Sequence, residues 1–573
     1  MNALTVSTAI YSGRVQLVTI RQRSLTVARL RVLLVAALFA ALAGAAVLRI
    51  AYLGLTDAAH GATSFAEALL PPRGEITDRN GQPLARAFPA FALWYNPEAL
   101  GGGSSLVKSP KEVALELKAI FPDIDEVELL ERLSTGKPGY LRRRVLPEEA
   151  NRVQAIGELA LELPQETDRH YPQGSMAAHV LGYVAADGHG RVGMESVLDK
   201  QLSDPAMRSQ SVPLSIDVRV QGALEDELTR GMRATNALGS AGIVLDVDTG
   251  EVMALASLPA FDPNQIDQAG AANMFNRVTN QVYELGSTFK PLTVAAAIDA
   301  GTVTDLSRRY SARPFPIGGF TIKDSHDLGA SLNVPEMLIH SSNVVTAHVV
   351  QDLGANRLKK TMADLHMNER PYIELPAKGF PIWASGDWPL LRGMTVGYGH
   401  GIAVTPLHLA SAYATMVNGG IWRPATLRKL DRAAIPAGER VFKASTSARM
   451  NQLLRMIAVY GTGRNANAPG FRVGGKTGSA EKPSAGGYKK NAVVATFAAA
   501  FPMDRPRYVV IAMLDEPQGT VASSFQRTAA WNAAPIVGRL VPRIGPMLGV
   551  SPDAHRDVDL TDLAPLVPKG GGE

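Results

Sequence analysis

The spacing of hydrophobic residues changes several times along the 573-residue chain, and each change predicts a different kind of element. Residues 32–48 are apolar and uncharged throughout; continued to residue 55, this stretch is long enough to span a membrane as a helix. Between residues 109 and 133 apolar residues recur at helical spacing with a break at Pro122, and residues 146–161 repeat the pattern. We therefore expect an apolar anchor followed by amphipathic helices.

Alternating apolar and polar residues predict strands in the second half of the chain. Residues 241–257 form two such runs around a turn at Asp248–Gly250, and residues 491–501 and 507–514 form two more. The segment around Lys476 lies just before the second pair, between glycine-rich loops, and is predicted to be their neighbouring strand. These strands, with helices between them, predict an α/β (mixed) fold with an antiparallel sheet flanked by helices.

Two smaller features complete the predicted organisation. The turn at Asp78–Gly81 lies between short apolar runs and predicts a hairpin, whereas residues 101–105 predict a loop. The segment before the strand-rich half has no convergent group of histidines or carboxylates, so we expect it to be an elongated α+β pedestal that provides reach and docking.

The distribution of charge argues against a nucleic-acid partner. The formal net charge is +5, but residues 1–56 hold six arginines and no lysine, and the remaining chain is nearly neutral. Five of these arginines precede the apolar stretch, which predicts a cytoplasmic N-terminus and an extracytoplasmic main body. A cleaved signal peptide is the competing interpretation, because small residues recur around residues 58–62. The absence of cysteine is compatible with the extracytoplasmic side.

The candidate chemistry begins at Ser287. Gly286 permits a sharp turn, and the following run of helix formers, closed by Gly301, places Ser287 where a helix begins. Lys290 lies about one helical turn further on, so its amine can reach back toward the Ser287 oxygen. Pro291 is tolerated in this first turn because its missing N–H has no intrahelical partner there. A serine beside a lysine is a candidate nucleophile with its base.

Ser-x-x-Lys is a common pattern, so the assignment depends on two further motifs. A Ser-x-Asn motif follows at Ser341 and Asn343, and a single Lys-Thr-Gly motif follows at Lys476–Gly478. A second Ser-x-Asn at Ser331 precedes a helix-like run and is interpreted as a helix start. The ordered set of three motifs is the one used by penicillin-binding proteins and serine β-lactamases. Further copies of Ser-x-x-Lys begin at Ser105, Ser134 and Ser479.

Three stretches outside these motifs resemble the pedestal motifs of class B penicillin-binding proteins. They are residues 73–85, residues 169–174 with 178–184, and residues 190–195, and with the catalytic motifs the similarity extends over residues 70–540. Residues 397–401, followed by residues 405–410, are most similar to the division-specific septal branch, the penicillin-binding protein 3 type, with the elongation-specific branch as the nearest alternative. The resemblance implies the penicillin-recognising serine transpeptidase fold.

The resemblance also implies a role for each candidate residue. Ser287 would attack the D-Ala-D-Ala bond with Lys290 as base, and Lys476 would supply the cation that lowers the pKa of that base. Ser341 would pass the proton to the leaving amine, and Asn343 would orient Lys290 and the substrate amide. The substrate carboxylate would be bound by Lys476 with the remaining members of the third motif, Thr477, Gly478 and Ser479, where serine replaces the family's more frequent threonine. The backbone N–H groups of Ser287 and Ser479 would form the oxyanion hole.

The expected partners are peptidoglycan stem peptides, β-lactams, the membrane, a SEDS-family glycosyltransferase and other division proteins. No metal or organic cofactor is implied, since the histidines lack zinc-ligand spacing. A β-lactamase and a non-catalytic β-lactam sensor or division scaffold remain as alternatives. The expected segments are a cytoplasmic segment 1–31, an anchor 32–55, a pedestal 56–211, a transpeptidase domain 212–545 and a flexible tail 546–573.

Overall fold

The structure is a computed structural model that describes residues 10–11, 14–15, 20–60, 72–99, 106–185, 187–484 and 487–568. The chain divides into two compact units, Met1–Leu70 and Pro71–Glu573. The expected loop at residues 101–105 lies outside the described residues.

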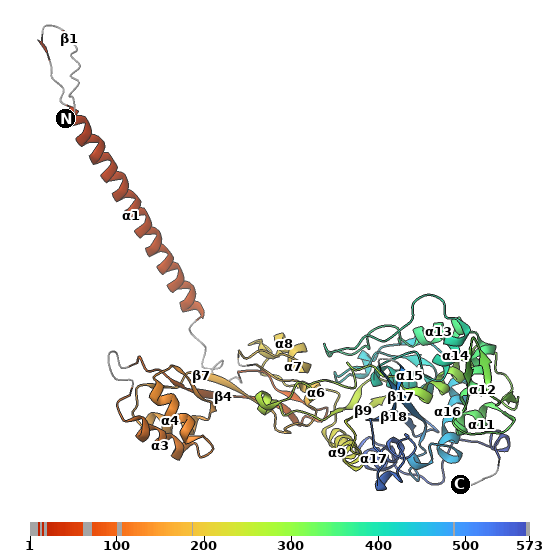
Figure 1. Cartoon of the computed structure of the whole chain (residues 1–573). Helices are drawn as coiled ribbons and strands as arrows, with labels where there is room; N and C mark the ends of the chain where they lie inside the picture. Colours follow the sequence, from red (N-terminus) through yellow and green to blue (C-terminus); the bar gives the residue numbers. More distant parts are fainter. Residues whose placement is uncertain are drawn as a thin grey trace. The chain divides into compact units, whose positions relative to one another are not determined.

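Among its described residues, the first unit contains a long helix, labelled α1 in Figure 1, and a short strand pair. Strands β1 (Ile10–Tyr11) and β2 (Arg14–Val15) pair in antiparallel fashion, and helix α1 extends over Ile20–His60. Within α1, Arg29–Arg49 has a mean hydropathy of 2.3 and none of its most apolar window is buried. This helix is therefore long and apolar enough to cross a membrane.

The first part of the second unit is built around strand β4 (Pro83–Tyr95), which pairs with four short partners. The hairpin expected at residues 78–81 is confirmed, because β3 pairs with β4 across this turn. The other strands of this sheet are β3 (Ile76–Thr77), β5 (Gly139–Val145), β6 (Leu161–Glu162), β7 (Gln165–His170) and β8 (Val212–Pro213). The helices are α3 (Pro110–Ile120), α4 (Glu126–Thr135), α5 (Pro147–Ala155), α6 (Ala178–Leu181), α7 (Gly193–Val197) and α8 (Asp199–Ser203).

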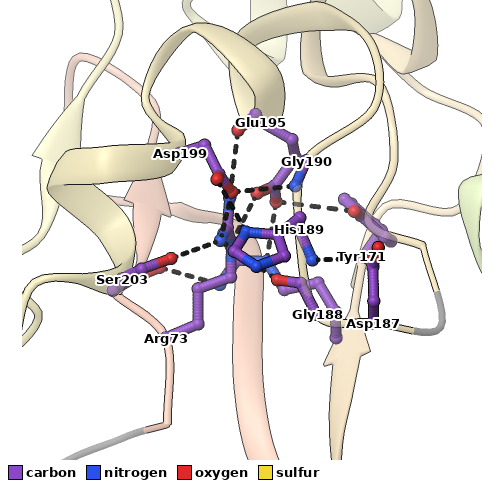
Figure 2. A network of polar contacts seen from close by, with 11 residues as sticks. Arg73, Tyr171, Asp187, Gly188, His189, Gly190, Glu195, Asp199 and Ser203 are labelled. Atoms are coloured by element: carbon purple, nitrogen blue, oxygen red, sulfur yellow. Dashed lines mark hydrogen bonds and ion pairs between the residues drawn. The ribbon is translucent and has the colours of Figure 1, made fainter.

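A buried ionic network joins distant segments of this region (Figure 2). The Glu195 carboxylate is fully buried and accepts hydrogen bonds from Arg73 Nε at 2.9 Å and Arg169 Nε at 2.6 Å. Arg73 also pairs with Asp199 at 2.8 Å. Since buried charges are tolerated only when paired and hydrogen-bonded, this network fixes the strand–helix junctions of the region.

The second part of the unit contains a five-stranded antiparallel sheet in the order β10-β9-β19-β18-β17. Figure 1 labels β9, β17 and β18 of this sheet. The strands are β9 (Gly239–Asp246), β10 (Val252–Leu258), β17 (Gly474–Ser484), β18 (Gly487–Phe501) and β19 (Tyr508–Asp515). The two predicted strand pairs and the Lys476 strand are thus confirmed, and β17 forms one edge of the sheet.

Helices cover both faces of this sheet. Alternate residues of β19 point to opposite faces: Val510 and Leu514 pack with α9 (Val218–Ala234) and α17 (Ala533–Met547), whereas Val509 and Ile511 belong to the larger core on the other side. The other helices are α10 (Lys290–Asp299), α11 (Val334–His340), α12 (Asn343–Leu353), α13 (Ala355–Asp364), α14 (Leu390–Gly397), α15 (Pro406–Val417) and α16 (Ala444–Tyr460). Two-stranded pairs are formed by β11 (Tyr310–Ser311) with β14 (Ser331–Leu332), β12 (Phe315–Ile317) with β13 (Phe320–Ile322), and β15 (Ile421–Trp422) with β16 (Glu439–Arg440).

The end of the chain, as far as residue 568, differs from the flexible tail expected over residues 546–573, of which residues 569–573 lie outside the described residues. Residues 551–568 pack against the rest of the second unit, and Leu563 is only 1% exposed and Val567 only 6%. Ion pairs with α16 accompany this packing: Asp557 pairs with Arg455 and Asp562 pairs with Arg449. The sequence is rich in proline and aspartate, but these few apolar and acidic residues suffice to hold it.

Candidate active site

Ser287 lies in a tight turn at the start of a buried helix. It belongs to the 3-10 turn η2 (Gly286–Phe289), which runs directly into α10 at Lys290. Gly286 has φ = +54°, a left-handed conformation that favours glycine, as the sequence predicted. Tyr413 of α15 donates its hydroxyl hydrogen to the Thr288 carbonyl at 2.8 Å, which fixes the turn from the inside of the domain. The Ser287 side chain itself is half-buried.

Ser341 occupies the junction between two helices. It ends α11 as the C-cap with φ = 63°, and Asn343 begins α12. The neighbouring Ser342 caps α12 by accepting a hydrogen bond from Val345 N. The second Ser-x-Asn motif is confirmed as a helix start, because Asn333 is the N-cap of α11.

The Asp324 carboxylate holds this junction in place, and sequence reasoning did not identify it. Asp324 accepts a hydrogen bond from the Ser342 hydroxyl at 2.7 Å and others from the backbone N–H groups of Asn343 and Val344. The carboxylate therefore satisfies the first N–H groups of α12, where negative charge is favoured by the helix dipole. Nothing in the sequence around Asp324 marks it, since its partners lie about twenty residues away.

Ser341 is contacted by both candidate lysines. Lys290 Nζ donates to the Ser341 carbonyl oxygen and lies 3.1 Å from Ser341 Oγ, and Lys476 Nζ lies 3.0 Å from the same Oγ. Both lysine side chains are fully buried. Three residues from α10, the α11–α12 junction and β17 thus form one hydrogen-bonded cluster.

Burial changes the protonation of both lysines, and the charge of Lys476 also acts on Lys290. Burial lowers the pKa of Lys290 well below its usual range, the charge of Lys476 lowers it further, and the Asp324 carboxylate raises it. Burial also lowers the pKa of Lys476, to about 7. A buried site of this kind disfavours two positive charges, so one amine near neutral pH is unprotonated and has a lone pair available to accept a proton.

Strand β17 lies directly against the Ser287 turn, and Gly478 makes this approach possible. A Cβ atom on Gly478 would lie 2.3 Å from the Leu285 carbonyl oxygen and 2.7 Å from Thr288 Cγ2. Thr477 Oγ1 forms a hydrogen bond with Thr462 Oγ1 at 2.8 Å, and Ser479 Oγ accepts one from Ala529 N at 2.9 Å. The third motif therefore lines the same site as Ser287.

Two expected contacts are not formed among the described residues. Lys290 Nζ is hydrogen-bonded to Ser341 and not to the Ser287 hydroxyl, and Asn343 Nδ2 donates to the Lys323 carbonyl at 3.4 Å rather than toward Lys290. Catalytic hydrogen bonds of a free enzyme are often long and tighten only when substrate is bound.

The geometry permits acyl transfer by a serine nucleophile. An unprotonated Lys290 can accept a proton from a neighbouring hydroxyl, and Ser341 offers a hydroxyl that both lysines contact. Lys476 places positive charge beside the hydroxyl of Thr477, to whose Oγ1 it lies at 3.2 Å, and this combination suits a carboxylate. The cluster thus combines a base, a proton relay and an anion-binding group beside the turn that carries Ser287.

The family is shown by comparison with known sequences. Residues 240–540 match the penicillin binding protein transpeptidase domain, and residues 68–211 match the penicillin-binding protein dimerisation domain. The chain belongs to the penicillin-binding protein transpeptidases.

Individual relatives show to which branch of the penicillin-binding protein transpeptidases the chain is most similar. The chain is 35% identical over 510 residues to the probable peptidoglycan D,D-transpeptidase FtsI of Caulobacter vibrioides, covering 87% of this chain and 85% of the relative. It is 30% identical to the peptidoglycan D,D-transpeptidase FtsI of Escherichia coli K12, covering 84% of each, and 31% identical to the probable transpeptidase PenA of Neisseria gonorrhoeae, covering 79% and 81%. These relatives identify the branch as the FtsI and penicillin-binding protein 3 type.

A solved structure agrees on the fold. Penicillin-binding protein 3 of Mycobacterium tuberculosis, solved in complex with aztreonam, matches with a TM-score of 0.65 and 23% identity, over 84% of this chain and 98% of that one. The fold prediction made from the sequence, a serine transpeptidase fold with a preceding pedestal region, is therefore confirmed.

Proposed function

We propose that this protein is the peptidoglycan D,D-transpeptidase that cross-links stem peptides during septal cell-wall synthesis. The observation that carries the proposal is the buried Lys290–Ser341–Lys476 cluster beside the Ser287 turn. Its relatives of the same branch are named peptidoglycan D,D-transpeptidases, and the matching solved structure holds a β-lactam.

The reaction proceeds through an acyl-enzyme. Ser287 Oγ attacks the carbonyl carbon of the D-Ala-D-Ala bond while Lys290 accepts its proton, and the backbone N–H groups of Ser287 and Ser479 stabilise the oxyanion. Ser341 then passes a proton to the departing D-alanine amine. An amine from a neighbouring stem peptide attacks the acyl-enzyme, forms the cross-link and frees Ser287. A β-lactam is attacked in the same way and leaves Ser287 acylated.

The remaining motif residues bind and orient the substrate. Lys476 with the Thr477 and Ser479 hydroxyls binds the terminal carboxylate, and Gly478 allows β17 to lie close enough to the nucleophile for this. Asn343 binds the peptide amide of the substrate.

The apolar helix anchors the protein in the inner membrane as a single span, with the N-terminus in the cytoplasm and the transpeptidase domain in the periplasm. This placement brings the catalytic domain to its substrate, the cell wall. Glycan strands are supplied by a SEDS-family glycosyltransferase, which acts with this protein and with other division proteins.

A complementation experiment in the host tests the proposal. Cells depleted of the protein should grow into filaments, because elongation continues while septal cross-linking stops. The wild-type gene should restore division, and Ser287→Ala, produced at the same level in the membrane, should not. Rounded cells instead of filaments would assign the protein to elongation, and rescue by Ser287→Ala would refute the catalytic proposal.

A further inference from the structure

The C-terminal segment contacts the active-site elements at two separate points. We call residues 551–568 the C-terminal clasp; its apolar residues Leu563 and Val567 are buried in the larger core. The catalytic reaction proposed above gives this segment no role, yet it is tied to α16 and α11, the helices that precede β17 and Ser341 in the chain.

The first contact passes through Arg455 of α16. Its guanidinium forms a bidentate pair with the Asp557 carboxylate, with Nη2 at 2.6 Å and Nε at 2.8 Å. Its Nη1 donates to the Val473 carbonyl and to Asn467 Oδ1, each at 2.8 Å. Val473 is the residue directly before β17, so one buried guanidinium links the clasp to the strand that carries Lys476.

The second contact lies at the far end of the clasp. The Leu566 carbonyl accepts a hydrogen bond from Asn333 Nδ2 at 2.7 Å. Asn333 is buried and is the N-cap of α11, the helix that ends at Ser341. The clasp therefore holds the beginning of the element that presents Ser341.

Helix α16 connects the two contacts. Directly after its C-terminal end, Thr462 N donates to the Ile339 carbonyl of α11 at 3.2 Å, and Thr462 Oγ1 bonds Thr477 Oγ1 of β17 at 2.8 Å. Lys476 lies on β17 and Ser341 lies at the end of α11, and α16 and the clasp hold these two elements together. The 3.0 Å contact between Lys476 and Ser341 therefore depends on α16 and the clasp.

We propose that the C-terminal clasp, acting through the Arg455–Asp557 pair, is a positioning element of the active site that sets β17 against α11 so that Lys476 and Ser341 meet. Asp557 is the acidic partner of Arg455 among the described residues. Without it the guanidinium would be left buried beside the Val473 and Asn467 oxygens with its charge unpaired, which favours a shift toward solvent. Such a shift would move the start of β17.

The test rests on the proposed function, because it measures acylation by a fluorescent penicillin. Asp557→Asn removes the charge partner of Arg455, and Arg455→Lys keeps the charge but loses the forked donor geometry. Asp559→Asn is the matched control, since this carboxylate in the same segment bonds only to Thr561 among the described residues. For each full-length variant we would measure the labelled fraction at completion, the acylation rate constant and its dependence on pH.

We expect both clasp variants to reach full labelling but to acylate at least about tenfold more slowly, since small misplacements of catalytic groups carry large rate costs. Their pH profiles should change shape, because the contact between Lys476 and Ser341 loosens, while Asp559→Asn matches the wild type. Lowered thermal stability with an unchanged acylation rate and pH profile would overturn the inference and leave the clasp purely structural. Absence of labelling in the wild type would refute the proposed function instead, so the two failures are distinguishable.

Discussion

Ser341 lies between two lysine amines, and the Asp324 carboxylate fixes the backbone beside it. At the scale of single residues, the protonation of the two lysines, Lys290 and Lys476, decides whether Ser287 can react. Lys290 has to be neutral to act as a base, whereas Lys476 has to be charged to bind a carboxylate. Acylation should therefore slow in acid as Lys290 becomes protonated, and it should slow in alkali as Lys476, with its pKa of about 7, loses its charge.

Asp324→Asn is predicted to shift the acidic limb of the acylation pH profile to lower pH. The native carboxylate raises the pKa of Lys290, so removing its charge leaves the pKa lower still and keeps the amine neutral in more acidic solution. His400 also lies within electrostatic reach of Lys290, and burial lowers its own pKa. The measurement is the rate of penicillin acylation as a function of pH. An acidic limb that stays in place or moves to higher pH would contradict this description of the cluster.

Gly478→Ala is predicted to impair acylation strongly. The new methyl group would overlap the Leu285 carbonyl oxygen, 2.3 Å away, and push β17 from the nucleophile turn. We expect a loss of about 100-fold in the acylation rate and of about 1–3 kcal/mol in stability.

The control for this variant is Gly270→Ala, an exposed position where an added Cβ meets nothing within 4 Å. It should behave as wild type in stopped-flow acylation and in thermal unfolding. A Gly478→Ala protein that acylates normally would show that the close approach of β17 is not needed.

At the scale of secondary-structure elements, the sequence predicted the hairpins and helices whose signals are local in the chain. The hairpins at Asp78–Gly81 and Asp248–Gly250 were predicted because alternation and turn residues are local signals. The helix expected over residues 146–161 is shorter, Pro147–Ala155, because Gly157 adopts φ = +75° and ends the helical run.

Contacts between distant elements could not be predicted from the sequence. The three motifs indicated the candidate site, since their order and residue types are diagnostic, but the capping of α12 by Asp324 was missed. So was the docking of residues 551–568, because a proline- and aspartate-rich sequence resembles a loop whether or not it packs. In each case the partner lies on another element, and no pattern within one segment encodes it.

The network around Glu195 is predicted to support the stability of the pedestal region without affecting the chemistry (Figure 2). Glu195→Gln leaves two buried guanidinium groups, Arg73 and Arg169, without the charge that both contact. We expect a loss of about 3–5 kcal/mol in the free energy of unfolding. Denaturant unfolding measures it, and acylation by penicillin of the folded protein should continue.

The matched control is Glu128→Gln, which breaks an ion pair with Arg132 whose side chains are both more than half exposed. Its effect should stay within about 0.5 kcal/mol. Equal stability of the two variants would mean that the Glu195 network contributes no more than a surface pair.

At the scale of the whole molecule, two compact units serve one reaction. The first provides an apolar helix that fits a membrane anchor, and the second contains the sheet whose edge strand β17 lines the candidate site. The family match spans most of the second unit. All the roles proposed for the residues of the candidate site depend on Ser287 being the residue that is acylated.

Intact-mass analysis and peptide mapping after incubation with a penicillin test this claim most directly. The detergent-solubilised wild type should gain one stable adduct, mapped to the peptide that contains Ser287, and Ser287→Ala should gain none. The adduct should be stable because a transpeptidase does not hydrolyse its acyl-enzyme quickly. An adduct on another residue, an adduct that persists in Ser287→Ala, or rapid loss of the adduct as in a β-lactamase would contradict the account.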